Sequence, residues 1–281
     1  MNWTYLNDSF FQKEEVRISP FDRGFLFGDA VYEVIPVYEG KIFLFSEHMA
    51  RLERSLLETG ISKPPVWNQM NKIIDQLLKK NNYPNQTVYL QVTRGVDSAR
   101  HHLPSSNIKP TLFITSYEFT VNPYRINPKK EGLDVKIVED PRWHRCDIKA
   151  VTLLSNIMAL EQANFDEKED VIFHRNGKIT EGTSSNVFAV FGELIMTPPT
   201  SKHILSGVTR KYIIDLLKSR NYSVSEEEID VQRLYGADEV WLTSSTKEIQ
   251  PIKSIDDKEL ISPESENSLW FKVLSSFFSQ D

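Results

Sequence analysis

A lysine in an apolar stretch is the first residue of this 281-residue chain that could do covalent chemistry. Lys149 stands between Ile148 and the largely apolar run AVTLL. Shielding a lysine from water favours its neutral amine, which is nucleophilic and can form a Schiff base with an aldehyde or ketone. A surface lysine whose stem packs on the core would give the same pattern, so the segment alone leaves both interpretations open.

A carboxylate followed by small hydroxyl residues forms a second chemical segment. Glu181 precedes Gly182 and the run TSSN at 183–186, between two apolar stretches. Such a carboxylate could pair with a protonated ring nitrogen, and hydroxyls such as that of Ser184 could bond phosphate oxygens. A polar hairpin turn is the alternative that this segment leaves open.

Two further segments have the composition of phosphate-binding turns. The first opens a stretch of helical apolar spacing and contains Leu205, Ser206, Gly207, Val208 and Thr209. The N–H groups and the dipole at the start of a helix attract anions. The second is the run TSST at 243–246, with Ser244 and Ser245 at its centre. Ordinary helix capping and a strand-to-loop turn are the corresponding alternatives.

Composition narrows the class of protein. Hydrophobic residues make up 40% and charged residues 26% of the chain, as in soluble globular proteins, and the formal charge is −6. This balance argues against nucleic acid or an anionic membrane as the main partner. The single cysteine, Cys146, excludes an internal disulfide. We see neither a signal peptide nor an apolar run of roughly 20 residues, and we therefore expect a cytoplasmic protein. We also expect no bound metal.

The chemical segments need elements to position them, and apolar periodicity predicts two blocks of strands and helices. In the first block, runs at 31–35 and 41–45 flank a tight turn and predict a hairpin. A helix is predicted from an N-cap at Ser46 to a stop at Gly60, with Leu52, Leu56 and Leu57 inward. A second helix at 67–80 and strands at 88–93 and 111–116 complete this block.

The second block has strands predicted at 133–138, 171–174, 185–191 and 239–243, and helices at 154–165, 208–219 and 266–278. Between the blocks, residues 121–130 contain two Asn-Pro pairs and few apolar residues, which is typical of a linker. We therefore predict an N-terminal α/β domain at 1–120, a linker at 121–130 and a C-terminal domain at 131–281 that carries the binding segments.

The sequence FDRGFLFGDAVYE at 21–33 resembles the signature region of fold-type IV, or class IV, pyridoxal-phosphate enzymes. Five more segments follow in the family's order, at 47–52, 142–149, 181–186, 207–210 and 243–248, so the resemblance spans about residues 15–255. The family includes D-amino-acid, branched-chain and (R)-selective amine transaminases and aminodeoxychorismate lyases. It implies an α+β fold with a small α/β N-terminal domain and a larger pseudo-barrel α/β C-terminal domain.

The resemblance also implies a cofactor, pyridoxal 5′-phosphate, and residues to hold it. Lys149 would be the catalytic Schiff-base lysine, and Glu181 would be the partner of the pyridine nitrogen. The other implied cofactor-binding residues are Arg51, Ser184, Leu205, Gly207, Val208, Thr209, Ser244 and Ser245. Family members are usually homodimers, with each active site between the two domains and completed by a loop from the other subunit. Ping-pong transfer between an amino acid and a 2-oxo acid is implied.

Within the family, the sequence is most similar to D-amino-acid transaminases around Lys149 and in the loop that ends His-His-Leu-Pro at 101–104. In those enzymes an arginine and a histidine on this loop bind the substrate carboxylate together with a tyrosine. Here Ala99 occupies the arginine's expected place and Arg100 follows it. The substrate-binding residues implied are Tyr32, Val34, Arg100 and His101. We therefore predict amino-group transfer from a D-alanine-like amino acid.

Other members of the family remain as alternatives. Aminodeoxychorismate lyase releases pyruvate to give 4-aminobenzoate with the same lysine, but such lyases tend to carry hydroxyl residues where this chain has Glu33 and Val34. A branched-chain or (R)-amine transaminase and a binder of pyridoxal phosphate without turnover are lower alternatives. A change in the absorption spectrum on addition of an amine would separate an enzyme from such a binder.

Overall fold

The computed structural model describes residues 2–260 and 267–277, which fall into two compact units. Unit 1 contains the chain up to Thr120 together with Ile148–Thr152, and unit 2 contains Val121–Asp147 and the chain from Leu153 onward. This division differs from the expected one in two places. The short segment around Lys149 belongs to unit 1, and residues 121–130 belong to unit 2.

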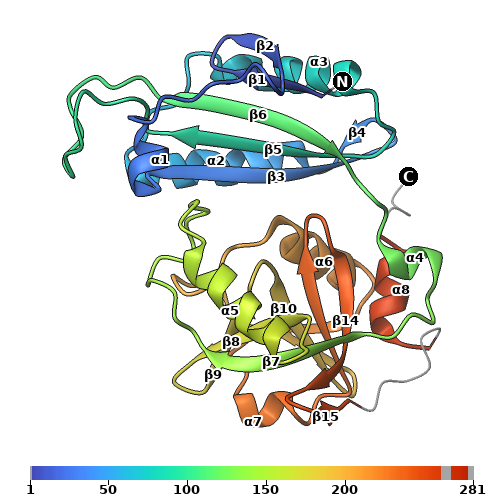
Figure 1. The fold of residues 1–281 in the computed structure, drawn as a ribbon. Coiled ribbons are helices and arrows are strands. Elements are labelled where there is room, and N and C mark those ends of the chain that lie inside the picture. Colours follow the sequence, from blue (N-terminus) through green and yellow to red (C-terminus); the bar gives the residue numbers. More distant parts are fainter. Residues whose placement is uncertain (1, 261–266, 278–281) are drawn as a thin grey trace. The chain divides into compact units, whose positions relative to one another are not determined.

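Unit 1 is built on a six-stranded antiparallel sheet with the strand order β2-β1-β6-β5-β3-β4 (Figure 1). Its strands are β1 (Trp3–Leu6), β2 (Ser9–Gln12), β3 (Ala30–Tyr38), β4 (Lys41–Ile42), β5 (Gln86–Thr93) and β6 (Thr111–Glu118). The predicted hairpin and the two predicted strands correspond to β3 to β6. Strands β1 and β2 were not expected from the sequence, since each has only four residues.

Two helices bury one face of this sheet. The helical elements are α1 (Arg23–Phe27), α2 (Phe45–Thr59), the 3-10 turn η1 (Trp67–Gln69) and α3 (Met70–Asn81). Leu52 of α2 and Ile74 of α3 pack with Ile35 and Leu90 of the sheet in one core. Helix α2 ends at Gly60 as predicted. The prediction that Leu57 faces the core was wrong, because this side chain is 80% exposed.

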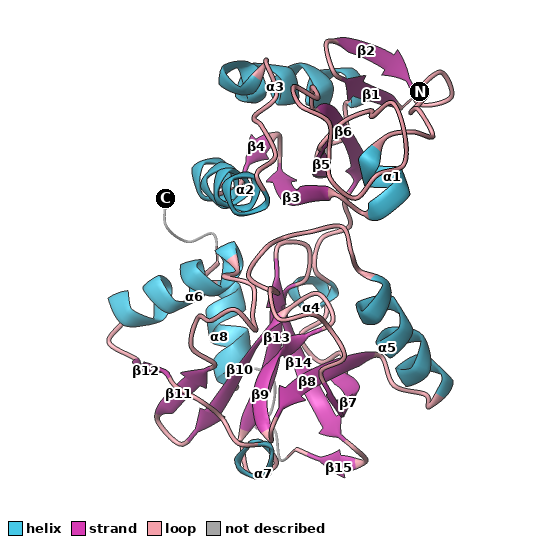
Figure 2. Cartoon of the chain, turned by 90° about the vertical axis from the view of Figure 1, so that its left-hand side faces the viewer, coloured by secondary structure: helices cyan, strands magenta, loops and turns pink. Residues whose placement is uncertain are grey.

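Unit 2 contains a nine-stranded mixed sheet in the order β12-β11-β10-β13-β14-β7-β8-β9, with β15 paired to β14. Its strands are β7 (Leu133–Glu139), β8 (Asp170–Arg175), β9 (Lys178–Gly182), β10 (Asn186–Phe191), β11 (Leu194–Thr197), β12 (Ser223–Glu226), β13 (Glu239–Ser244), β14 (Glu248–Ile255) and β15 (Lys258–Glu259). The pairs β11–β12, β14–β7 and β7–β8 are parallel. The sheet curls into a half-barrel (Figure 2), which confirms the predicted α+β fold with its pseudo-barrel domain.

Within the described residues, five helices accompany this sheet: α4 (Pro123–Ile126), α5 (Leu154–Phe165), α6 (Val208–Ser219), α7 (Val231–Leu234) and α8 (Leu269–Ser275). Figure 2 shows α6 and α8 on one side of the sheet and α5 on the other. Helices α5 and α6 have the predicted bounds. Helix α8 lies within the helix predicted at 266–278, whose two end residues are outside the described part of the chain. None of the described helices is long and apolar enough to cross a membrane.

The expected linker is an ordered part of unit 2. Tyr124 of α4 is fully buried, and its ring lies edge-on to Trp270 with 5.5 Å between the ring centres. The Asn122 amide donates hydrogen bonds to the backbone carbonyls of Lys247 and Ile249 at 2.7 and 2.9 Å. These contacts with residues far along the chain, rather than local composition, give the segment its structure.

Candidate active site

Lys149 is fixed in unit 1 through its backbone. Its carbonyl oxygen accepts a hydrogen bond from the Tyr32 N–H of β3 at 3.0 Å, and its own N–H donates to Ser55 Oγ of α2 at 3.4 Å. The next residue, Ala150, forms an antiparallel bridge with Val31. Strand β4 pairs with β3 only at its far end, so Ile148–Thr152 completes the edge of β3.

The Lys149 amine lies on the open face of the unit 1 sheet. Side chains alternate along β3, so that Val31, Glu33 and Ile35 are buried while Tyr32 and Val34 are half-exposed on the opposite face. Lys149 Nζ lies 4.4 Å from the centre of the Tyr32 ring. The lysine is half-buried, which agrees with the expectation that it does not lie freely in solvent.

A tyrosine that sequence reasoning missed lies on the same open face. The ring centres of Tyr32 and Tyr89 are 5.7 Å apart, and Tyr89 pairs with Val34 across β3 and β5. The Tyr89 hydroxyl donates to Gln91 Oε1 at 2.6 Å, and burial raises its pKa to about 12. The pairing register of two non-consecutive strands places it here, and no local sequence signal announces that register.

Arg51 lies on the buried face in an ion pair. Its Nε donates to Glu33 Oε1 at 2.7 Å and one terminal nitrogen donates to Oε2 at 2.8 Å, while His48 Nδ1 lies 2.8 Å from Oε2. Burial alone would raise the pKa of Glu33, but the Arg51 guanidinium lowers it to about 2. Burial lowers the pKa of His48, so its neutral ring donates to the carboxylate. Arg51, implied as a phosphate ligand, is thus also the counter-ion of Glu33.

The loop after β5 is held by α1. Arg23 is 3% exposed, and its guanidinium donates to the backbone carbonyls of His101 and His102 at 2.6 and 2.8 Å. Arg100 is exposed, with its guanidinium carbon 4.9 Å above the centre of the Phe27 ring. The backbone of this loop is therefore anchored, while the side chains of Arg100 and His101 remain accessible in unit 1.

Glu181 is the centre of the site residues in unit 2. Its side chain is buried at the end of β9, and it accepts hydrogen bonds from the Leu205 N–H at 2.9 Å and the Asn186 amide at 3.2 Å. Arg142 Nη1 lies 2.6 Å from the other carboxylate oxygen. Burial raises the pKa of Glu181, and the Arg142 guanidinium is the main contact that opposes the rise. Sequence reasoning did not assign a role to Arg142.

The start of α6 approaches the same point. Gly207 is the N-cap of α6, and a Cβ at this position would lie only 2.0 Å from Asn186 Oδ1. Val208 and Thr209 are buried in the first turn, and Leu205 is half-buried before it. Unit 2 therefore gathers Glu181, Leu205 and Gly207 around Asn186.

Two buried hydroxyls beside Asn186 have no hydrogen-bond partner within the described residues. They are Ser185 Oγ, which precedes β10, and Thr243 Oγ1, whose residue pairs with Asn186 across β10 and β13. A buried polar group without a partner is costly, and an anionic or heteroaromatic ligand would supply acceptors. This donor set fits pyridoxal phosphate. Ser184 is exposed, while Ser244 and Ser245 are half-buried at the end of β13.

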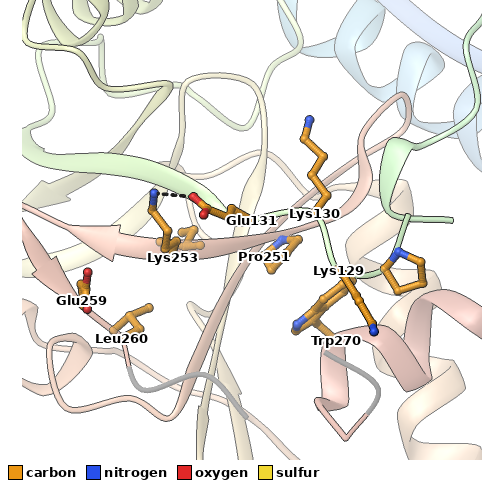
Figure 3. Close-up of a pocket in the computed structure, with 11 residues that line it drawn as sticks. Lys129, Lys130, Glu131, Pro251, Lys253, Glu259, Leu260 and Trp270 are labelled. Carbon is orange, nitrogen blue, oxygen red and sulfur yellow. Dashed lines mark hydrogen bonds and ion pairs between the residues drawn. The ribbon is translucent and has the colours of Figure 1, made fainter. Parts of the chain in front are cut away.

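A separate depression of about 370 Å³ lies on unit 2 (Figure 3). It is lined by residues 128–132, 251–253, 259, 260 and 270. Lys253, at its edge, forms ion pairs with Glu131 and Asp134 at 3.0 and 3.1 Å. None of the residues that the resemblance implicates lines it. The described residues contain no group of three or more His, Cys, Asp or Glu side chains that could hold a metal ion.

Comparisons with known proteins identify the family of the chain. Residues 30–255 match the model of the family described as amino-transferase class IV. The D-alanine aminotransferase of Staphylococcus haemolyticus is 37% identical over 262 residues, which cover 92% of this chain and 91% of that protein.

Solved structures show the same fold. The branched-chain amino acid aminotransferase of Escherichia coli superposes with a TM-score of 0.88 at 22% identity, covering 99% of this chain and 94% of that one. A hypothetical aminotransferase from Mycobacterium tuberculosis, solved in its pyridoxal-phosphate-bound form, superposes with a TM-score of 0.84 at 18% identity, covering 99% of this chain and 100% of that one.

Proposed function

The chain belongs to the class IV aminotransferases, and we propose that it transfers amino groups between a D-amino acid such as D-alanine and a 2-oxo acid, with pyridoxal 5′-phosphate as its cofactor. The similarity to a D-alanine aminotransferase over 92% of the chain supports the choice of substrate. The structural observation that carries the proposal is the anchored backbone of Lys149, whose amine projects onto the open face of the unit 1 sheet.

Lys149 is the catalytic residue in this proposal. Its amine would hold the cofactor covalently and, once free, would take the Cα proton of the amino donor as a base and return it as an acid. The bound cofactor supplies an electron sink for the carbon that loses this proton. The hydrogen bonds from Tyr32 and to Ser55 keep the lysine backbone in place while its side chain moves.

We propose that residues of unit 2 bind the pyridine ring and the phosphate of the cofactor. Glu181 would accept the N–H of the pyridine ring and keep it protonated, and Leu205 would pack against the ring. The start of α6, at Val208 and Thr209, and the hydroxyl segments that contain Ser184, Ser244 and Ser245 would donate hydrogen bonds to the phosphate. Arg51 would contribute its charge. The unpartnered hydroxyls of Ser185 and Thr243 support this placement.

The substrate carboxylate is bound by Arg100 and His101, together with Tyr32. A guanidinium can bind a carboxylate through two parallel hydrogen bonds, which fixes both position and orientation. Val34 lies beside Tyr32 on the open face and contacts the substrate side chain. The backbone of the loop is anchored by Arg23, which supports a binding role for the two exposed side chains.

The protein works as a homodimer. Helix α5 exposes an apolar stripe at helical spacing, in which Leu154 is 69%, Ile157 50%, Met158 59% and Phe165 83% exposed. Only Ala163 of this helix is buried. Contiguous exposed apolar surface of this kind is typical of a protein–protein contact, and a second copy of the chain is its proposed occupant.

The test begins with the holoenzyme and its covalent bond. We expect borohydride reduction of the cofactor-loaded protein to trap the cofactor on Lys149, as seen by peptide mass spectrometry, and Lys149→Ala to abolish this trapping. D-alanine with 2-oxoglutarate should give pyruvate, while L-alanine should not. Failure of trapping, or 4-aminobenzoate from aminodeoxychorismate with no reaction of D-alanine, would contradict the proposal.

A further inference from the structure

Four charged side chains of unit 2 form a row of alternating sign that ends at Glu181. Arg175 Nε lies 3.0 Å from Asp140, Asp140 lies 2.9 Å from two nitrogens of Arg142, and Arg142 Nη1 lies 2.6 Å from Glu181. The side chains of Arg142, Asp140 and Glu181 are each less than 10% exposed. Along the row the charges therefore alternate from the positive Arg175 to the negative Glu181, in a largely buried part of the unit.

The contacts of Glu181 fix its protonation state. Its three hydrogen-bond partners are the Arg142 guanidinium, the Asn186 amide and the Leu205 N–H, and all three donate. A carboxylate has about four acceptor positions, so three are used and one is left. A protonated carboxyl group would place its own O–H against one of these donors. The donor set is thus matched to the carboxylate form, with room for one more N–H donor.

Arg142 is the only charged donor among the three. Burial raises the pKa of Glu181, and only the guanidinium brings a positive charge to oppose this. Asp140 holds the same guanidinium from the other side, and Arg175 in turn holds Asp140 and donates to the backbone carbonyl of Arg142 at 2.8 Å. Arg142 is therefore fixed in position by partners that leave its Nη1 directed at Glu181.

We propose that Arg142 is a positioning residue of the transamination reaction, which keeps Glu181 ionised and thereby keeps the pyridine nitrogen of the cofactor protonated. This inference rests on the proposed function, in which Glu181 is the partner of that nitrogen. A protonated ring nitrogen beside Glu181 would be positively charged and would extend the row of alternating charges by one member. Loss of Arg142 leaves the carboxyl group protonated, so that it no longer stabilises the ring N–H.

Two other buried or partly buried titratable groups near the row, Cys146 and His203, have pKa values shifted toward their neutral forms. Burial raises the pKa of Cys146 to about 11, so its thiol keeps its proton. Burial lowers the pKa of His203, and its ring lies edge-on to that of His144 at 5.6 Å. The charges that face Glu181 from the segment after β7 and from β8 are therefore those of Asp140, Arg142 and Arg175.

The test measures the ring nitrogen directly. Wild type, Arg142→Met, Arg142→Lys and Glu181→Gln are loaded with pyridoxal phosphate labelled with ¹⁵N in the ring, and the ¹⁵N chemical shift is followed against pH. Methionine keeps an apolar stem over the Phe173 ring, which Arg142 covers at 4.6 Å, so packing is largely preserved. Arg145→Met is the matched control, because Arg145 lies on the same segment but pairs with Asp147.

We expect the wild-type and Arg145→Met shifts to be those of a protonated ring nitrogen. Arg142→Met should move the shift to that of the unprotonated ring, as Glu181→Gln does, and Arg142→Lys should restore part of the protonated signal. The kcat for D-alanine should fall about 10- to 100-fold in Arg142→Met, the range known for residues that hydrogen-bond to metal ligands, with little change in KM. Arg142→Met combined with Glu181→Gln should be no slower than Glu181→Gln alone.

Each result decides a different claim. A protonated ring in Arg142→Met beside an unprotonated ring in Glu181→Gln overturns the role of Arg142. A protonated ring in Glu181→Gln overturns the proposed role of Glu181 itself. A shift in Arg142→Met that Arg142→Lys does not restore at all points to packing instead of charge and also overturns the inference. If Arg142→Met does not fold, the shift in Arg142→Lys decides, since it must lie between those of wild type and Glu181→Gln.

Discussion

Two buried glutamates show how local partners decide the charge of a side chain. Glu33 faces a guanidinium fork and a histidine, and the Arg51 charge outweighs burial, so that the pKa falls to about 2. Glu181 receives one arginine nitrogen and two neutral donors, and here burial prevails and raises the pKa. The first carboxylate is therefore a fixed structural charge. The ionised form of the second depends on its one charged partner, Arg142.

The fixed charge of Glu33 predicts a measurable loss of stability when it is removed. Glu33→Gln removes the carboxylate that pairs with the buried guanidinium of Arg51, and we expect the free energy of unfolding to fall by about 3–5 kcal/mol. Glu53→Gln is the control on the same helix as Arg51, because its ion pair with Lys63 is half in solvent and should contribute about 1 kcal/mol or less. Chemical denaturation at neutral pH measures both.

The same residue sets a pH window. The pKa of Glu33 is lowered from 4.5 to about 2, so its stabilisation is complete above about pH 4.5 and disappears as the pH falls through about 2. The difference in stability between wild type and Glu33→Gln should shrink over this window. A difference that stays constant down to pH 2 would contradict the ion pair as its cause.

At the residue scale, the sequence identified side chains better than it identified their partners. Lys149 stands out as a lysine among apolar neighbours, and Glu181 stands out as a carboxylate followed by small hydroxyl residues. Their partners could not be predicted in this way. Arg142 meets Glu181 across 39 positions of sequence, and Arg51 meets Glu33 across 18. Such pairs depend on which strands and helices become neighbours, and local composition carries no signal of that.

Elements were predictable where their pattern is local. Helices α5 and α6 have the bounds that apolar spacing predicts. The start of α2 was predicted at Ser46, but the helix begins at Phe45 after Leu44, which has a φ of 49° and caps without its side chain. Leucine in this left-handed conformation gives no sequence signal, because glycine and asparagine are the usual residues there.

The close approach of α6 to β10 makes a prediction at Gly207. In Gly207→Ala the new Cβ displaces Asn186, whose amide donates to Glu181 and to the Leu205 carbonyl. We expect the dissociation constant of pyridoxal phosphate to rise on the order of 10-fold or more, since each lost hydrogen bond is worth about 1 kcal/mol. Gly236→Ala should leave the constant unchanged, because its nearest neighbour would lie at 3.5 Å. Equal affinities of the two variants would refute this packing argument.

Gly95 supports a second prediction at the scale of elements. It lies at the base of the loop that carries Arg100, with a φ of 111°, and a Cβ there would lie 1.9 Å from the Lys109 carbonyl oxygen. Gly95→Ala should therefore lower the unfolding free energy by more than the roughly 1–3 kcal/mol that backbone strain alone costs. Gly40 also has a positive φ but has open space around it, so Gly40→Ala measures the cost of backbone strain without a steric clash. Calorimetry of both variants should find Gly95→Ala clearly less stable.

At the scale of the whole molecule, the exposed stripe on α5 predicts the assembly state. We expect the wild-type protein to have twice the 32.5 kDa mass of one chain in light scattering. Met158→Glu places a charge in the middle of the stripe and should give monomers, because burying an unpaired charge is costly. Leu57→Glu, at an exposed leucine of α2, is the control that should remain dimeric. A dimeric Met158→Glu would place the contact elsewhere.

The path of the chain also bears on its synthesis. Unit 1 is not complete when its first 120 residues have left the ribosome, because Ile148–Thr152 must still be made. Until then the nascent chain exposes the edge of β3 at Val31 and Tyr32, with backbone groups available to any other strand. Translation must therefore proceed through part of unit 2 before the first unit can close. The segment that closes this edge is the one that delivers Lys149, so the nascent protein seals its first unit and acquires its reactive amine in a single event.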